Sequence, residues 1–184
     1  MYDLGVFFRR FFACFSLCTF LLLIPMKALA PSAKHAALLC VDSGEFLYEK
    51  NADTSCGMAS TTKIMTALLA IESGSLDTLI TIPDAAIGIE GSSLYLKQGE
   101  KMTMRDLVYG LMLRSANDAA EAIAIVLGGS IEGFAEQMNA KATELGLTHT
   151  HFTNPHGLAE DDHYTTAKDL AKLAAYALEN PIFR

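Results

Sequence analysis

The order of predicted elements indicates an α+β fold, in which a strand hairpin precedes a block of helices. Residues 36–41 are apolar enough for a buried strand, residues 42–45 form a polar turn, and residues 46–49 return as a second strand. From residue 60 onward, apolar residues recur at helical spacing in several separate segments. Strands followed by helices are typical of α+β rather than alternating α/β proteins, so we expect a sheet beside a helical subdomain.

Start and stop signals define the individual helices. The segment 60–73 has apolar positions at helical spacing and ends at Gly74. Thr103 and Asp106 form a capping-box pattern, which predicts a helix over 104–113. The same reasoning predicts further helices over 118–127, from 130 to about 145 and from 166 to about 179, and short strands over 78–82 and 93–96.

The N-terminus has the composition of a secretory signal peptide. Arg9 and Arg10 precede an apolar run over 11–24, and the small-x-small triplet 28–30 follows it. The apolar run is shorter than the roughly 20 residues that a membrane-spanning helix needs. We therefore expect residues 1–30 to be an export signal and the remaining domain to lie outside the cytoplasm.

Overall composition excludes several classes of protein. The chain has 184 residues, a formal net charge of −7 and 51% hydrophobic residues, and it has no Trp. A chain this apolar is not intrinsically disordered, and the acidic balance gives no support for nucleic-acid binding. Export permits disulfides, but Cys40 lies in an apolar strand-like run, which favours a free thiol over a bridge to Cys56.

The first candidate catalytic motif is Ser60-Thr61-Thr62-Lys63, at the start of the most regular predicted helix. Residues three apart lie on one helical face, so the Ser60 hydroxyl and the Lys63 amine can approach each other. A serine needs an adjacent base to act as a nucleophile, and a lysine can be that base when burial lowers its pKa. The alternative is that Ser60 caps the helix and Lys63 is solvated.

The second candidate motif is Ser115-Ala116-Asn117, between two predicted helices. A hydroxyl and an amide in such a loop can project into a cleft, pass a proton and bind a peptide carbonyl. The alternative is that Asn117 is only the N-cap of the following helix. A Ser-x-x-Lys helix start followed by a Ser-x-Asn loop is the serial order of the penicillin-recognising serine enzymes.

These motifs lie in stretches that resemble the D-alanyl-D-alanine carboxypeptidases of low molecular mass, which are penicillin-binding proteins. The stretches are MASTTKIMTALLAIE, LMLRSANDAAEAIA and THFTNPHGLAEDDHYTTAKDLAKLAAYAL, and the most specific part is the loop 154–158. The resemblance implies a D,D-peptidase-like fold, with Ser60 as the acylated nucleophile and Lys63 as its base. It also implies that Ser115 relays a proton and that Asn117 binds the substrate.

The resemblance further implies the partners and the place of action. The substrate would be a peptidoglycan stem peptide ending in D-Ala-D-Ala, and β-lactam antibiotics would acylate the same serine. The family's third motif, Lys-Thr-Gly on a strand, does not occur in the sequence. We therefore expect residues 31–184 to be the N-terminal part of the catalytic domain, with an incomplete sheet and poor turnover. Membrane contact would come only from the export signal or from a C-terminal anchor that this sequence lacks.

Two other functions stay open. A non-catalytic module that binds the cell wall or a β-lactam fits the absence of Lys-Thr-Gly. A class A β-lactamase shares the first motif but needs Ser-Asp-Asn and a Glu-x-x-Leu-Asn segment. The nearest match to that segment begins at Glu144, and Thr148 stands where the Asn should be.

Four histidines crowd the segment 149–163, which raises the possibility of a metal site. The two-His spacing of a helical zinc site is absent, and the neighbouring Asp161 and Asp162 lie in a predicted loop. We therefore predict no metal and no cofactor, and we expect His156 to shape the rim of the loop.

Overall fold

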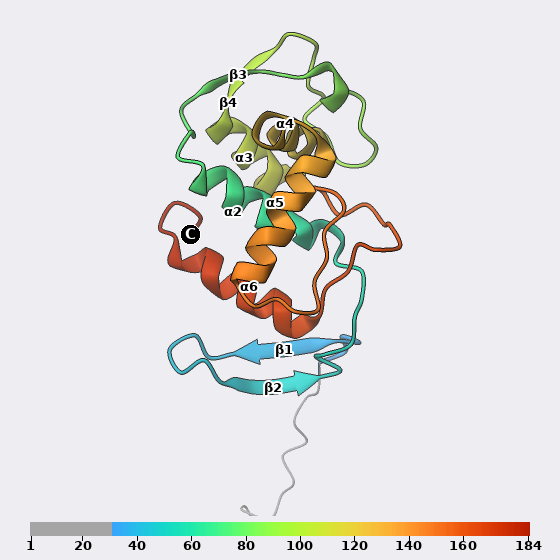
Figure 1. The fold of residues 1–184 in the computed structure, drawn as a ribbon, viewed down its shortest axis with the longest axis vertical. Coiled ribbons are helices and arrows are strands. Elements are labelled where there is room, and N and C mark those ends of the chain that lie inside the picture. The colour runs from blue at the N-terminus through green and yellow to red at the C-terminus, as the bar shows by residue number, and fades with distance from the viewer. Residues whose placement is uncertain (1–30) are drawn as a thin grey trace, which may run out of the picture. The chain divides into compact units, whose positions relative to one another are not determined.

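The predicted hairpin is present in the computed structural model, which describes residues 31–184 (Figure 1). Strands β1 (Ala36–Leu39) and β2 (Phe46–Lys50) pair antiparallel, with an irregularity between Leu38 and Leu39. A second antiparallel pair joins β3 (Leu79–Thr81) to β4 (Lys101–Thr103), and the short 3-10 turn η2 (Asp84–Ala86) lies between them in the chain. The predicted export signal, 1–30, lies outside the described residues.

The five α-helices are the longest elements of the described chain, and the central one is α2 (Lys63–Glu72). It is preceded by the 3-10 turn η1 (Ala59–Thr62) and contacts all four other helices. These are α3 (Met104–Arg114), α4 (Asn117–Gly128), α5 (Ile131–Glu144) and α6 (Ala167–Glu179). In Figure 1, α6 lies between the β1–β2 hairpin and α2, and the β3–β4 pair lies beyond α3 and α4. The α+β prediction is confirmed.

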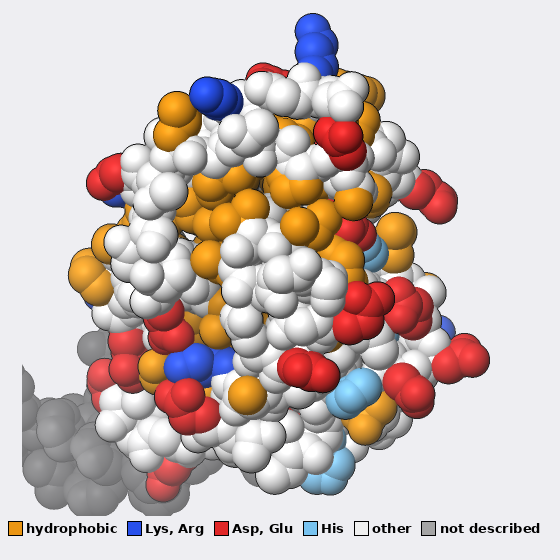
Figure 2. Space-filling model, turned by 45° about the horizontal axis from the view of Figure 1, so that its top comes forward, with side chains coloured by type: hydrophobic (Ala, Val, Ile, Leu, Met, Phe, Trp, Pro, Cys, Tyr) orange, Lys and Arg blue, Asp and Glu red, His pale blue; other side chains and the backbone are white. Residues whose placement is uncertain are grey.

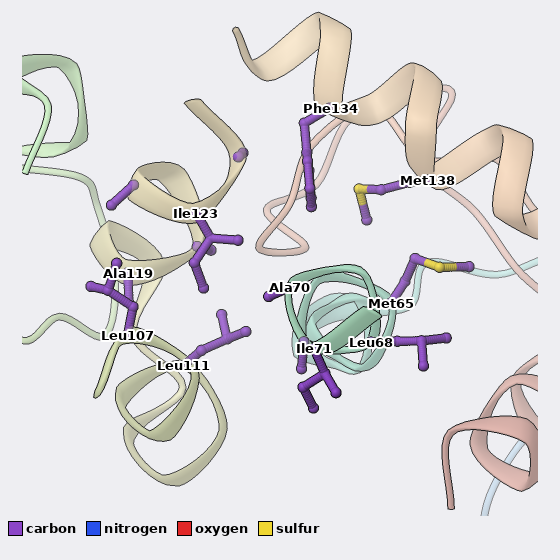
Figure 3. Close-up of a cluster of buried hydrophobic side chains, with 14 of the residues drawn as sticks. Met65, Leu68, Ala70, Ile71, Leu107, Leu111, Ala119, Ile123, Phe134 and Met138 are labelled. Atoms are coloured by element: carbon purple, nitrogen blue, oxygen red, sulfur yellow. The ribbon is translucent and has the colours of Figure 1, made fainter. Parts of the chain in front are cut away.

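The core is built around α2. Leu68 and Ile71 of this helix are buried, together with Leu111 of α3, Ile123 of α4 and Phe134 of α5. Figure 3 shows α2 almost end-on, with Leu111 and Ile123 to its left and Phe134 above it. Burying a large aliphatic or aromatic side chain is worth roughly 1.5–3 kcal/mol. This packing therefore fixes α2, and with it the first candidate motif, in the interior of the domain.

Helix ends follow the sequence signals closely. Thr103 and Asp106 form the predicted capping box, and the Ser130 side chain accepts from the Gly133 amide at the start of α5. The strand predicted over 93–96 is not formed. Its alternating apolar residues lie in a loop whose backbone is held by the buried carboxylate of Asp118.

Asp118 organises this loop through several hydrogen bonds. Its carboxylate accepts from the amide of Leu94 at 3.0 Å, from the amide of Leu96 at 3.2 Å and from Ser93 Oγ at 2.6 Å. A carboxylate from a helix thus supplies the acceptors that a partner strand would have given. Since Asp118 directly follows Asn117, the same contacts hold the loop against the second candidate motif.

Apolar side chains also reach the surface, and Figure 2 shows several of them on one face. Leu38 and Leu47 of the hairpin are among the exposed ones.

Cys40 and Cys56 are free thiols. Among residues 31–184, no helix is long and apolar enough to cross a membrane.

We predict that Asp118→Ala destabilises the protein by about 3 kcal/mol, because it leaves buried amides without an acceptor. The measurement is the free energy of unfolding from urea denaturation. Glu136→Ala, at an exposed position of α5, is the control and should change the value by less than about 0.5 kcal/mol. A loss below about 1 kcal/mol for Asp118→Ala would contradict the anchoring role.

Candidate active site

The turn η1 presents Ser60 to solvent just before α2 begins. Ser60 is exposed, and its Oγ lies 3.4 Å from Nζ of Lys63. The preceding residue, Ala59, has a φ of +44°, a left-handed conformation that is unfavourable for a residue with a Cβ. Backbone strain of this kind persists only where surrounding contacts enforce it, and it is common at functional sites.

Lys63 is buried, with only 2% of its surface exposed. Its Nζ donates to Oδ1 of Asn117 and to the backbone oxygen of His156, both at 2.7 Å. Burial disfavours the charged ammonium and lowers the pKa of Lys63 to about 8. An amine that can lose its proton near neutral pH, beside an exposed hydroxyl, is the arrangement of a nucleophile with its base.

The second motif lies in the connection between α3 and α4. Ser115 has a φ of +54° and ends α3, and Asn117 is the first residue of α4. The capping alternative for Asn117 does not hold, because Ala116 occupies the N-cap and the Asn117 side chain contacts Lys63 instead. The Asn117 Nδ2 group donates to the backbone oxygen of Glu90 at 2.6 Å.

Three of the predicted site residues line one cleft of about 370 Å³. Ser60, Lys63 and Ser115 share it with apolar side chains of α2 and α3 that include Ile64, Leu111 and Met112. Within residues 31–184, no hydrogen bond joins the Ser115 hydroxyl to Ser60 or Lys63, so what the three residues share is the lining of the cleft. Asn117 is connected to these three residues through its hydrogen bond with Lys63.

The loop 154–158 closes the base of the site. Its backbone oxygens accept from α2, with Pro155 bound by Thr66 Oγ1 at 2.6 Å and His156 bound by Lys63. Gly157 has a φ of +92°, and a Cβ there would overlap the Ala59 carbonyl and lie 2.9 Å from Thr62 Oγ1. Only glycine allows this approach, which explains why the loop carries a glycine beside the Ser60 turn.

The crowded histidines have separate partners. His163 is buried and its Nε2 lies 2.7 Å from Thr62 Oγ1, whereas the His156 ring contacts Glu121 of α4. His151 Nδ1 lies 2.7 Å from the Asp162 backbone oxygen, and exposed His149 lies beside Thr148. In the part of the chain that the structure describes, no three His, Cys, Asp or Glu side chains converge on a common point.

Comparison with known proteins places this chain in a family. The profile of the D-alanyl-D-alanine carboxypeptidase family of peptidases matches residues 25–183. This chain belongs to that family. The resemblance noted in the sequence is thereby confirmed, and the family's members are serine peptidases.

Two curated relatives show what share of a relative's length this chain spans. The D-alanyl-D-alanine carboxypeptidase DacF of Bacillus subtilis is 41% identical over 156 residues, and that of Streptomyces sp. strain K15 is 40% identical over 154 residues. These alignments cover 82% and 77% of this chain. They cover 40% and 53% of the relatives, so the chain spans about half of their length or less.

Solved structures of the family share the fold. The D-alanyl-D-alanine carboxypeptidase DacD of Francisella tularensis matches with a TM-score of 0.79 and 39% identity, over 83% of this chain and 38% of that one. A variant of the Streptomyces K15 DD-transpeptidase matches with a TM-score of 0.80 and 37% identity, over 85% of this chain and 65% of that one. The predicted D,D-peptidase-like fold is therefore confirmed for the part that this carboxypeptidase family member shares with them.

Three contributors to the site in this family member were not identified from the sequence. Thr62 and His163 hold the Ser60 turn against the loop 149–164, and Glu121 contacts His156. The position of Thr62 inside the Ser-x-x-Lys motif was visible, but its distant partner was not. In the sequence, only the crowding of histidines over 149–163 indicated that this region has a special role.

We predict that His163 makes the protein less stable in mild acid. Burial lowers the pKa of His163 from 6.5 to about 4, so between these values the unfolded chain binds a proton that the folded protein does not. The free energy of unfolding should therefore fall as the pH drops from 6.5 to 4, by about 3 kcal/mol in total from this group.

The measurement compares urea denaturation at several pH values for the wild type and for His163→Gln. The variant should lose most of this pH dependence, whereas the control His149→Gln, at an exposed position, should keep it. Equal slopes for the wild type and His163→Gln would show that His163 does not titrate as expected.

Proposed function

We propose that this chain forms the front part of a serine-type D-Ala-D-Ala carboxypeptidase that removes the terminal D-alanine from peptidoglycan stem peptides. The observation that carries the proposal is the exposed Ser60 hydroxyl, 3.4 Å from a buried Lys63 amine with a lowered pKa. The same serine would be acylated by β-lactams, whose strained amide resembles the D-Ala-D-Ala peptide bond. The enzyme would act outside the cytoplasm after residues 1–30 direct its export.

In the proposed acylation, Ser60 Oγ attacks the carbonyl carbon between the two D-Ala residues. The hydroxyl proton passes to the neutral Lys63 amine, and the amide N–H of Ser60 contributes to stabilising the oxyanion. When the carbon–nitrogen bond breaks, the departing D-alanine takes up a proton and an ester remains on Ser60. Water then hydrolyses the ester. With a β-lactam the broken amide stays attached, because it is part of a ring.

The contacts of Lys63 suit the neutral form of the amine. A neutral amine has two hydrogens and one lone pair, and Asn117 Oδ1 and the His156 oxygen accept at 2.7 Å each. These two acceptors use both hydrogens, so the lone pair is left for the Ser60 proton. The 3.4 Å separation is longer than the roughly 2.6–3.2 Å of a proton-transfer contact, and substrate binding typically tightens such contacts.

We assign Ser115 the relay of the proton to the leaving amine, because it lines the cleft with Ser60 and Lys63. Asn117 is proposed to bind the substrate's peptide group. Its carbonyl oxygen already binds Lys63 and its amide nitrogen binds Glu90, so substrate binding by Asn117 requires that the latter contact be exchanged. Asn117 therefore has a second proposed role, which is to hold the base in place.

The class A β-lactamase alternative has less support. Its candidate deacylating residue, Glu144, is 60% exposed in its side chain and forms an ion pair with Lys141. A non-catalytic binding module remains the second candidate, since Lys-Thr-Gly does not occur in the sequence. Such a module would bind a β-lactam reversibly or release D-alanine at no measurable rate.

The serine assignment predicts a covalent penicilloyl adduct. We expect mass spectrometry of the purified protein after incubation with penicillin to show one adduct, on the peptide that contains Ser60. Ser60→Ala should abolish it because, among residues 31–184, Ser60 is the hydroxyl that is hydrogen-bonded to the Lys63 amine, whereas Ser55→Ala, at an exposed position on the preceding loop, should leave it unchanged. An adduct that survives Ser60→Ala would disprove the assignment.

The role of Lys63 predicts how acylation depends on pH. Below its pKa of about 8, the neutral fraction of Lys63 rises tenfold per pH unit. The acylation rate constant should therefore rise between pH 6 and 8 and become level above about 8. Stopped-flow kinetics with a chromogenic β-lactam measures it, and hydrolysis without protein is the control. A rate constant that is flat over this range would exclude Lys63 as the base.

A further inference from the structure

Glu121 and His156 form a mostly buried pair that the proposed chemistry does not use. His156 Nε2 lies 3.1 Å from Glu121 Oε1, and the two side chains are 6% and 13% exposed. Glu121 belongs to α4 and His156 to the loop 154–158, so the pair joins two segments far apart in sequence. A polar pair that is shielded from water has to be well satisfied to avoid a large desolvation penalty.

The His156 ring is held at both nitrogens. The amide of Leu158 donates to Nδ1 at 3.1 Å, so Nδ1 is the unprotonated nitrogen. The neutral ring then carries its hydrogen on Nε2, which donates it to Glu121. These two bonds fix the ring orientation, and the Asn154 side chain further fixes the backbone by accepting from the amides of His156 and Gly157.

The backbone of the same residue contacts the proposed base. The His156 oxygen accepts from Lys63 Nζ at 2.7 Å, and Asn117 Oδ1 accepts from the same nitrogen at the same distance. Asn117 and Glu121 are four residues apart on α4 and therefore lie on one face of the helix. Helix α4 thus holds Lys63 twice, directly through Asn117 and indirectly through Glu121 and His156.

We propose that Glu121 is a positioning residue for the proposed acylation, acting through the His156 ring to fix the backbone oxygen that receives a hydrogen bond from Lys63. This inference rests on the proposed function. Glu121 touches neither Ser60 nor the cleft, and its effect is to set where the Lys63 nitrogen lies relative to the Ser60 hydroxyl. A misplacement of about 1 Å in such a group can slow a reaction by about 100-fold.

Two variants separate position from charge. Glu121→Gln keeps the length of the side chain and an oxygen that accepts from His156, but it removes the charge. Glu121→Asp keeps the charge but withdraws the carboxylate by about 1.5 Å, one carbon–carbon bond. The measurement is acylation by a fluorescent penicillin, resolved into the limiting rate constant and the concentration for half-maximal rate.

The inference predicts that Glu121→Asp lowers the limiting rate constant by about 10- to 100-fold and leaves the half-maximal concentration within about twofold. Glu121→Gln should stay within about threefold of the wild type in both quantities. The control is Glu136→Asp, the same change at an exposed position of α5, which should have no effect. Circular dichroism melting verifies that each variant is folded, and Glu121→Ala replaces Glu121→Asp if the latter is not.

The outcomes are distinct. A wild-type protein that penicillin does not acylate at Ser60 would overturn the proposed function and this inference with it. A wild type that is acylated normally, with Glu121→Asp or Glu121→Ala folded and equally fast, would overturn the inference alone. A loss in Glu121→Gln as large as in Glu121→Asp would also overturn it, because the charge rather than the position would then matter.

Discussion

The amine of Lys63 is buried in the interior, and the residues of the site are arranged so that they form hydrogen bonds with it. A buried amine is costly unless every hydrogen has an acceptor, and burial is also what lowers its pKa to about 8. The partners of the amine come from three segments: Asn117 on α4 and His156 in the loop 154–158 accept its hydrogens, and Ser60 lies beside it on the preceding turn. The same contacts that satisfy the amine therefore bring the proposed nucleophile, the proposed base and the second motif together in one place.

This arrangement depends on unusually close backbone packing. Gly157 lies against the Ala59 carbonyl, and Ala59 itself is held in a left-handed conformation. The core around α2 supplies the rigidity that maintains this strain, because Leu68 and Ile71 are packed between three other helices. Stability and chemistry are thus linked at α2, whose buried face anchors the domain and whose first turn carries Lys63.

Features that depend on neighbouring residues could be predicted from the sequence, whereas contacts between segments far apart in the chain could not. The hairpin, the capping box at Thr103 and the proximity of Ser60 to Lys63 follow from turn chemistry and helical spacing, so they were predicted correctly. The 93–96 segment was mistaken for a strand because its alternating apolar residues mimic one, while the carboxylate of Asp118 holds its backbone instead. Glu121 and His156 are 35 residues apart, and no periodicity in the sequence pairs them.

The long-range nature of the Lys63 contacts has a consequence for how the protein folds. Asn117 is 54 residues from Lys63 along the chain, and His156 is 93 residues away. Contacts between distant residues form late, because a large loop has to close before they contribute. Helix α2 and the Ser60 turn can therefore exist on the folding pathway before the contacts that position the proposed base have formed. The proposed nucleophile, Ser60, would become reactive only when the loop 154–158 has docked, so acylation would itself report the completion of folding.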